Sequence, residues 1–239
     1  VIRSNIIRDN VAGVALSESN GNIVEGNTFL NNSMYGVTSE DFSASNTIKD
    51  NTISDSPYGI ELSDTSSSQV VNNTVSGASY GTYLAYSNNN NVSANKLTSN
   101  SWNIYLSYSN SNIVKKNSVL GGSVGIQIMR SEGNSVFNNT VSVISYCIYL
   151  GYCGANTVSG NTASSSDWGI ELYSTTGSTV SENLVKDNSW GFYLAESCKN
   201  NYVYFNNIIN NVKQVFQDPT SSPNTCLLYT SPSPRDRTR

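Results

Sequence analysis

Six residues recur at one position of a repeating pattern and could bind sugars through aromatic stacking. They are Tyr83, Tyr105, Tyr149, Tyr193, Glu61 and Glu171. Each lies between two columns of mostly apolar residues, so strand alternation predicts that it faces solvent. A row of flat tyrosine rings with interspersed carboxylates could stack on sugar rings, and we take these residues as candidates for glycan binding. The alternative is that stacked tyrosines only stabilise neighbouring strands.

Enzymatic chemistry has few candidate residues in this chain. The sequence contains no histidine, which excludes Ser-His-Asp triads and imidazole metal ligands. Glycosidase-type catalysis needs two carboxylates about 5–9.5 Å apart. Glu61 and Glu171 are five repeats apart, about 24 Å at the spacing of β-strands. Soft-metal sites need clustered Cys, Met or His, whereas Cys147, Cys153 and Cys198 are scattered. We therefore expect no catalytic residues, no metal site and no cofactor.

An asparagine column indicates the elements that position these side chains. Seven of its members are 22 residues apart, namely Asn51, Asn73, Asn95, Asn117, Asn139, Asn161 and Asn183. Short segments that alternate apolar and polar residues, rich in valine and isoleucine, recur at fixed distances from them and are typical of half-buried strands. One repeat cannot bury its apolar side alone, whereas stacked repeats form a continuous core. The pattern predicts an all-β fold, a right-handed parallel β-helix with three short strands per coil of about 22 residues and nine to ten coils.

Three columns of this repeat have expected structural roles. The asparagines should form a ladder in which each amide hydrogen-bonds to the same residue of the next coil. A glycine column that includes Gly59 and Gly81 marks a positive φ or a close backbone approach. A structural aromatic stack is expected from Tyr35, Tyr58, Tyr80, Trp102, Tyr146, Trp168 and Trp190. A leucine-rich repeat is the alternative fold, but it requires a second leucine-rich segment where this chain has serine, threonine and asparagine.

The composition changes at Cys226. Residues 226–239 lack the repeat and resemble the translation of a sequencing-library adapter, a contaminant of reading frames assembled from metagenomic DNA. We predict a single β-helix domain over residues 1–225, truncated at both ends, and a non-native, disordered tail over residues 226–239. Because solenoids need polar caps, we expect an uncapped fragment to self-associate end to end.

Charge and hydropathy narrow the range of partners and locations. The chain has 13 basic and 17 acidic residues, a net charge of −4, which is unfavourable for binding nucleic acid. No apolar run approaches the roughly 20 residues of a membrane span. N-x-S/T sequons begin at Asn31, Asn72, Asn91 and Asn138, as in many exported proteins. We expect an extracellular, cell-surface or periplasmic location, with the signal segment not present in this stretch.

The repeat units resemble those of NosD-type parallel β-helix proteins. The resemblance is carried by units such as residues 95–114, NKLTSNSWNIYLSYSNSNIV, and by Tyr204–Asp218, which is similar to the family's final repeat. It covers Asn5 to about Thr225. The resemblance implies periplasmic copper handling linked to the maturation of nitrous oxide reductase.

These observations predict a non-catalytic secreted or cell-surface β-helix protein, with a structural role or with a polysaccharide or cell-surface glycan as its partner. Two alternatives remain open. The chain could be a module of a carbohydrate-active enzyme (a lyase, hydrolase or epimerase) whose catalytic coils lie outside this sequence. It could also be a NosD-like copper-handling factor.

Overall fold

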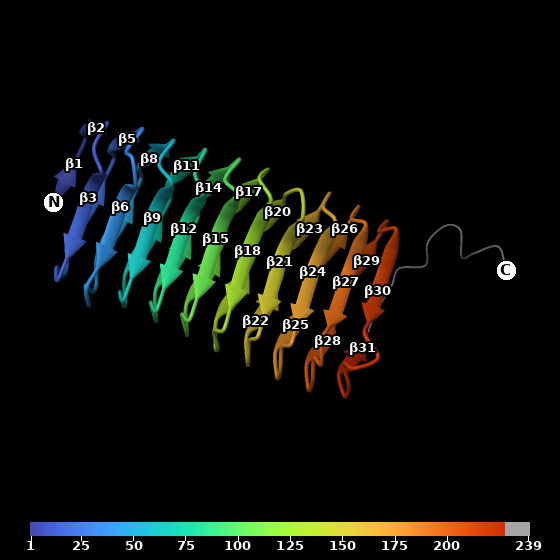
Figure 1. Cartoon of the computed structure of the whole chain (residues 1–239). Helices are drawn as coiled ribbons and strands as arrows, with labels where there is room; N and C mark the ends of the chain where they lie inside the picture. The colour runs from blue at the N-terminus through green and yellow to red at the C-terminus, as the bar shows by residue number, and fades with distance from the viewer. Residues whose placement is uncertain (228–239) are drawn as a thin grey trace.

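The computed structural model describes residues 1–227, which form a solenoid of stacked coils without a helix (Figure 1). Each complete coil contributes one strand to each of three parallel sheets. The β-helix predicted from the repeat is therefore confirmed. The leucine-rich alternative is wrong, because the side of the coil rich in serine, threonine and asparagine is also built from strands.

Three sheets run the length of the solenoid. Sheet 1 has eleven strands: β1 Ile2–Arg3, β4 Ile23–Glu25, β7 Thr47–Lys49, β10 Gln69–Val71, β13 Asn91–Ser93, β16 Ile113–Lys115, β19 Ser135–Phe137, β22 Thr157–Ser159, β25 Thr179–Ser181, β28 Tyr202–Tyr204 and β31 Thr225–Leu227. Sheet 2 has ten: β2 Ile6–Arg8, β5 Thr28–Leu30, β8 Thr52–Ser54, β11 Thr74–Ser76, β14 Lys96–Thr98, β17 Ser118–Leu120, β20 Thr140–Ser142, β23 Thr162–Ser164, β26 Leu184–Lys186 and β29 Asn207–Ile209. Sheet 3 also has ten: β3 Ala12–Ser17, β6 Tyr35–Glu40, β9 Tyr58–Ser63, β12 Tyr80–Ala85, β15 Trp102–Ser107, β18 Val124–Met129, β21 Tyr146–Gly151, β24 Trp168–Tyr173, β27 Trp190–Ala195 and β30 Lys213–Gln217.

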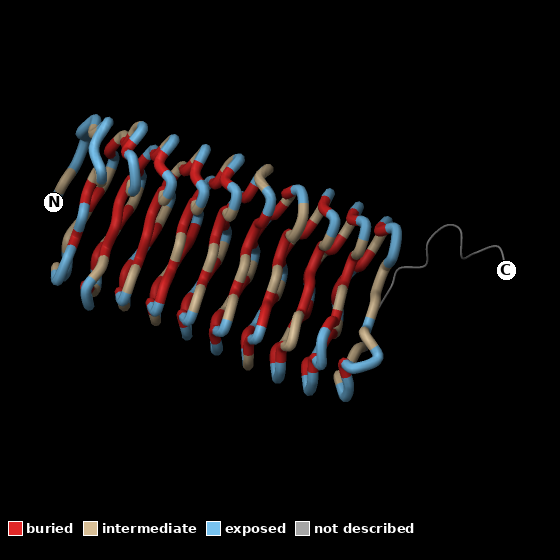
Figure 2. Tube along the Cα trace, in the orientation of Figure 1, coloured by how far each residue is buried: buried red, intermediate tan, exposed pale blue. Residues whose placement is uncertain are grey.

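Parallel pairing between successive coils places equivalent side chains next to one another. Val70 pairs with Val92 in sheet 1, and Leu84 pairs with Leu106 in sheet 3. All four side chains are fully buried in one core that runs along the solenoid. Figure 2 shows buried segments recurring in every coil between exposed turns. In the described residues, no helix is long and apolar enough to cross a membrane.

The predicted asparagine ladder is present at a corner of each coil. The Asn95 amide donates to Asn117 Oδ1 at 3.0 Å, and the Asn117 amide donates to Asn139 Oδ1 at 2.9 Å. The backbone N–H of Asn95 donates to the same Asn117 oxygen at 2.9 Å. The same amide-to-amide bond joins Asn51, Asn73, Asn95, Asn117, Asn139, Asn161, Asn183 and Asn206. The ladder therefore satisfies the amides buried at this corner and fixes the register of the coils.

The glycine column reflects a close backbone approach rather than a positive φ. A Cβ on Gly59 would lie 2.6 Å from the Gly81 carbonyl oxygen and 2.4 Å from Val75 Cγ1. Neither Gly59 nor Gly81 has a positive φ. Glycine stands at this position because the next coil passes too close for a side chain.

Replacing Gly59 should therefore destabilise the solenoid. We expect Gly59→Ala to lower the free energy of unfolding by about 2 kcal/mol, because the methyl group overpacks the contact between coils. Gly154→Ala is the matched control, since only the flexible end of Glu132 lies near its added Cβ, at 3.3 Å. Urea unfolding measures both variants, and equal midpoints for the two would contradict this account of the column.

The register at the C-terminal end departs from a simple continuation of the 22-residue repeat. Simple continuation of the repeat predicts Tyr202 in the core and Asn200 in a second polar column. Instead Val203 pairs with Val180 and is buried, whereas Tyr202 is 52% exposed. Asn201, rather than Asn200, takes the place in the second polar column, where its Oδ1 accepts from the Ser178 backbone N–H. The reason is one extra residue in the turn after Ala195, where Glu196 and Ser197 both have positive φ.

The expected domain boundary lies at the last described strand. β31 extends from Thr225 to Leu227, and Cys226 pairs with Val203. Sheet 1 therefore continues across the 225/226 boundary by two residues. Residues 228–239 of the expected tail lie outside the described residues, and their non-native origin stays a prediction.

Candidate functional site

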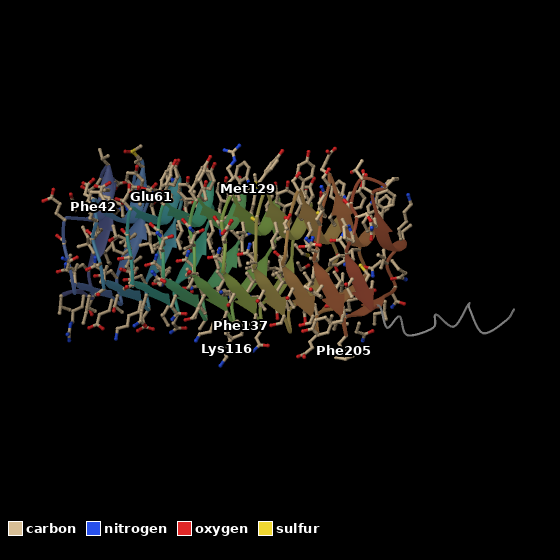
Figure 3. The ribbon with its side chains drawn as sticks, turned by 90° about the horizontal axis from the view of Figure 1, so that it is seen from below. Phe42, Glu61, Lys116, Met129, Phe137 and Phe205 are labelled. Carbon is tan, nitrogen blue, oxygen red and sulfur yellow. The ribbon has the colours of Figure 1, made fainter. Side chains whose placement is uncertain are left out.

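Sheet 3 carries two rows of large side chains outside the core. The first row begins each strand of this sheet, as at Tyr58, Tyr80 and Trp102. The second row lies three residues later and contains the candidate residues Glu61, Tyr83 and their equivalents. In Figure 3, Glu61 and Met129 lie along one edge of the solenoid, whereas Lys116, Phe137 and Phe205 lie along the opposite edge. Sheet 3 thus gives one side of the rod an aromatic surface.

The first row forms the structural stack predicted from the sequence over most of its length, whereas Trp190 packs edge-on against Tyr193 at 5.2 Å. Tyr58 stacks on Tyr80 with ring centroids 5.1 Å apart, and Tyr80 stacks on Trp102 at the same distance. Further along, Tyr146 stacks on Trp168 at 4.6 Å. The interplanar angles of 12°, 17° and 13° show that these rings lie nearly parallel. Their faces therefore point along the row, toward the neighbouring coils.

The row of aromatic residues is interrupted at the coil where β18 has Val124 in place of an aromatic residue. Val124 pairs with Trp102 on one side and with Tyr146 on the other. Trp102 and Tyr146 are thus two coils apart, about 9.6 Å at the usual strand spacing. Tyr80 covers one face of Trp102 and Trp168 covers one face of Tyr146, so their other faces look toward the gap. A flat guest in contact with both rings needs roughly 7–8 Å, which this gap provides.

A cleft of about 370 Å³ occupies this gap. It is lined by Trp102, Val124, Gln127, Tyr146, Tyr149, Glu171 and Tyr173. Apolar and aromatic walls with a few polar groups are typical of small-molecule sites, and the volume lies within their usual range. The cleft therefore has the size and the chemistry to hold one or two sugar rings.

Two contacts hold the aromatic walls in place. The Trp102 indole N–H donates to Gln127 Oε1 at 2.9 Å, which orients the ring beside the cleft. The ring of Tyr149 lies over Gly151, where an added Cβ would be 2.8 Å from Tyr149 Cε1. Gly151 thus allows Tyr149 to lean toward Tyr173, whose ring centroid is 6.4 Å away. Both walls are preorganised by residues of β18 and β21.

Among the described residues that line the cleft, Glu171 is the only acidic one. Its side chain is 6% exposed, and in residues 1–227 it has no hydrogen-bond or ion-pair partner. Burial raises the pKa of Glu171 to about 7. Burial, and secondarily the charge of Glu171, also raises the pKa of Tyr146 and of Tyr149. The cleft therefore combines aromatic faces with a carboxyl group that titrates near neutral pH.

The pH dependence of stability should report this carboxyl group. Between about pH 4.5 and pH 7 the folded protein retains a proton on Glu171 that the unfolded chain has released, so stability falls as the pH rises. Relative to Glu171→Gln, we expect the wild-type free energy of unfolding to fall by up to about 3 kcal/mol between pH 4.5 and pH 8. Urea unfolding of the wild type and of Glu171→Gln at both pH values gives the difference between their free energies of unfolding. The contribution of Glu61 cancels in this difference because both proteins contain it. If the difference in free energy of unfolding between the wild type and Glu171→Gln does not change with pH, the burial of an unpartnered Glu171 is contradicted.

The structure separates the six predicted binding residues into different environments. Tyr149 and Glu171 line the cleft. Tyr83 stacks on Tyr105 at 5.3 Å, and Tyr193 stacks on Phe216 at 4.7 Å, as cross-strand pairs. The four tyrosines are partly exposed, but solvent exposure is a wrong prediction for the glutamates, because neighbouring rings cover them. Glu61 is only 8% exposed and accepts a hydrogen bond from Thr38 at 3.3 Å.

Sequence reasoning missed three aromatic walls of the cleft. Trp102 and Tyr146 are in the row predicted to be purely structural, and Tyr173 comes from a third position in the strand. The signal in the sequence was the missing aromatic residue at Val124, which separates an otherwise regular column into two stacks.

A larger hollow of about 820 Å³ runs along the turns elsewhere on the solenoid. Its wall includes Leu120, Ile144 and Val212, which are exposed, together with short polar side chains. The buried amide of Asn188 in this wall already donates to Asn211 at 2.9 Å. Because its buried polar groups bond to one another, we place the candidate site in the smaller aromatic cleft.

Comparison with protein families agrees with the resemblance of the repeat units. The family model described as "Periplasmic copper-binding protein (NosD)" matches residues 1–104 and 58–234. The chain belongs to the NosD family. The family resemblance predicted from the repeats is thus confirmed. No curated protein sequence matched this NosD-family chain.

Several solved β-helix structures are similar to this NosD-family chain. The A-module of the Azotobacter vinelandii mannuronan C-5 epimerase AlgE6 has a TM-score of 0.65 and 14% identity, over 90% of this chain and 65% of the module. The periplasmic alginate epimerase AlgG, as a mutant, has a TM-score of 0.55 and 12% identity, over 87% of this chain and 70% of AlgG. The tailspike of Escherichia coli bacteriophage HK620, solved with a pentasaccharide, has a TM-score of 0.57 and 12% identity, over 90% of this chain and 54% of the tailspike. At these identities the likeness shows the fold alone. The NosD-family chain spans less than two thirds of the AlgE6 module and about half of the tailspike.

The copper named in the family description does not fit the donor groups of the described residues. Within residues 1–227 there is no cluster of three or more His, Cys, Asp or Glu side chains. Cys147 lies on β21, Cys153 lies in the turn after β21, and Cys198 lies in the turn after β27; all three are buried. Burial raises the pKa of the Cys147 and Cys153 thiols to about 11. Copper prefers thiolate, thioether or imidazole ligands gathered at one point. The described residues therefore do not provide a copper site.

Proposed function

We propose that the NosD-family chain binds a polysaccharide or cell-surface glycan outside the cytoplasm, with one sugar unit held in the aromatic cleft. The observation that carries the proposal is the gap at Val124, which leaves one face of Trp102 and one face of Tyr146 uncovered. The apolar face of a pyranose ring can pack against such rings while its hydroxyl groups reach polar side chains at the rim. Gln127 and Glu171 are the polar groups that line this cleft beside the tyrosine hydroxyls.

The neighbouring structures support a role in glycan chemistry on the level of fold. One is a mannuronan C-5 epimerase, one is a periplasmic alginate epimerase, and the third was solved with a pentasaccharide. A periplasmic or extracellular location, proposed here from the family description, would bring the cleft into contact with such polymers. The long parallel surface of sheet 3 would allow a polymer to extend beyond the cleft in either direction.

Catalysis and copper handling have less support from the same residues. A paired-carboxylate mechanism needs a second acid about 5–9.5 Å from the first, and Glu171 is the only acid that residues 1–227 contribute to the lining of the cleft. The described cysteines and carboxylates form no cluster of three or more that could hold a metal ion. Binding is therefore the activity that the geometry supports best.

Calorimetric titration with a panel of tetrasaccharides tests the proposal. The panel contains neutral, amino and uronic acid sugars, and at least one member should bind. Trp102→Ala should weaken that binding by about 2 kcal/mol, roughly thirtyfold, because it removes one wall. Trp190→Ala removes the same ring from the same row outside the cleft and should change the affinity less than twofold. Failure of every sugar to bind would contradict the proposal. Equal losses of affinity in Trp102→Ala and Trp190→Ala would show that the sugar binds outside the cleft.

A further inference from the structure

One feature of the cleft is not explained by stacking on a neutral sugar. Glu171 lines the cleft, is 6% exposed and has no partner among the described residues. Burying a carboxylate without a hydrogen bond or a counter-charge is unfavourable, and buried acids are usually paired. A ligand that brings its own positive donor would supply the missing partner.

The groups that face Glu171 are aromatic or acidic. Tyr146 and Tyr149 face it from β21, Tyr193 faces it from β27, and Tyr173 lies on the same strand. The other titratable groups near this cluster are Tyr152, Asp167, Glu196, Asp218 and the buried thiol of Cys198. Two cations lie over neighbouring rings, Arg130 at 5.8 Å from the Tyr152 ring and Lys213 at 3.8 Å from the Trp190 ring, and neither pairs with Glu171. None of the four ion pairs within residues 1–227 involves Glu171. The cleft therefore offers negative charge and π faces to a cation.

We propose that the cleft selects glycans that carry a free, protonated amine, such as a de-N-acetylated hexosamine, over neutral and acidic glycans. This selectivity rests on the proposed function, because it assumes that a sugar enters the cleft. The ammonium group would donate a charge-assisted hydrogen bond to Glu171 and lie against an aromatic face. A uronate would instead bring a second carboxylate beside Glu171, and like charges at close range repel.

Cation binding should depend on the ionisation of Glu171. Because burial raises the pKa of Glu171 to about 7, the carboxyl group is mostly protonated at pH 5 and mostly ionised at pH 8. The surrounding tyrosines Tyr146, Tyr149, Tyr173 and Tyr193 have pKa values raised above 10 and stay protonated over this range. A probe with a fixed charge, such as tetramethylammonium, should therefore bind more tightly at pH 8 than at pH 5.

The test compares three tetrasaccharides by calorimetry at pH 7, made of glucosamine, N-acetylglucosamine and galacturonic acid. The glucosamine tetramer should bind about tenfold more tightly than the N-acetylated one, and the galacturonic acid tetramer should bind most weakly. Glu171→Gln should remove the preference for the amine and the pH dependence of tetramethylammonium binding. Glu61→Gln is the matched control, since this glutamate occupies the same row outside the cleft and should leave both unchanged.

The outcomes separate the two proposals. Equal affinity for the glucosamine and N-acetylglucosamine tetramers, unchanged in Glu171→Gln, would overturn the amine selectivity and leave glycan binding intact. Failure of all three sugars together with pH-dependent tetramethylammonium binding would overturn glycan binding and retain Glu171 as a cation site. Failure of every probe would overturn both.

Discussion

Asn117→Ala should lower the free energy of unfolding by about 3–5 kcal/mol, a large share of the stability of a typical domain. The Asn117 side chain is 1% exposed and bonds to the coils on both sides. It accepts from the backbone N–H and the side-chain amide of Asn95, and it donates to Val92 O at 3.0 Å and to Asn139 Oδ1 at 2.9 Å. Alanine would leave two buried donors of Asn95 without an acceptor, at about 1–3 kcal/mol for each unsatisfied group.

Urea unfolding measures this loss, and Asn207→Ala provides the control. Asn207 lies on β29, is exposed, and makes no side-chain hydrogen bond with any residue of the described chain. Surface substitutions of this kind usually change stability by less than about 0.5 kcal/mol. A loss below about 1 kcal/mol in Asn117→Ala would show that the ladder does not stabilise the coils.

Val124→Tyr should abolish glycan binding while the fold is retained. Tyrosine at this position would continue the row between Trp102 and Tyr146, with the spacing of about one coil seen along the rest of the stack. The new ring would occupy the cleft that a sugar needs. Elsewhere in the row, neighbouring rings already stack at 4.6–5.1 Å, so the substitution should not lower stability.

Ala12→Tyr is the matched control for this substitution. Ala12 occupies the same row and pairs with Tyr35 at the N-terminal end of sheet 3. The Ala12→Tyr substitution adds the same ring away from the cleft, so the glycan affinity measured by calorimetry should match that of the wild type. Undiminished binding in Val124→Tyr would place the glycan site elsewhere on the molecule.

Much of the fold could be predicted from the sequence because a solenoid repeats one local rule. The interval of 22 residues between the asparagines predicted the ladder that joins Asn95 to Asn117 and Asn139. The rule failed where the interval changed. One extra residue before Asn201 moved Val203 into the core and Tyr202 out of it, and a fixed period cannot predict which turn absorbs an insertion.

The candidate site was predictable only in part. Strand alternation correctly placed Tyr149 and Glu171 in one row outside the core, but alternation says nothing about what lies over a side chain. The burial of Glu171 depends on the rings of the neighbouring coils, and the cleft depends on the small side chain at Val124. Both are properties of several coils together, whereas the repeat describes only one.

The most direct test of the glycan-binding cleft uses the fluorescence of Trp102. The chain has three tryptophans, and only Trp102 lines the cleft. A Trp168→Phe, Trp190→Phe double variant therefore places the sole indole at the proposed site. Titration with the tightest tetrasaccharide of the panel should change the Trp102 emission in a saturable manner, with the same dissociation constant as calorimetry. Calorimetric binding that leaves the emission of Trp102 unchanged would contradict the proposal that the sugar occupies this cleft.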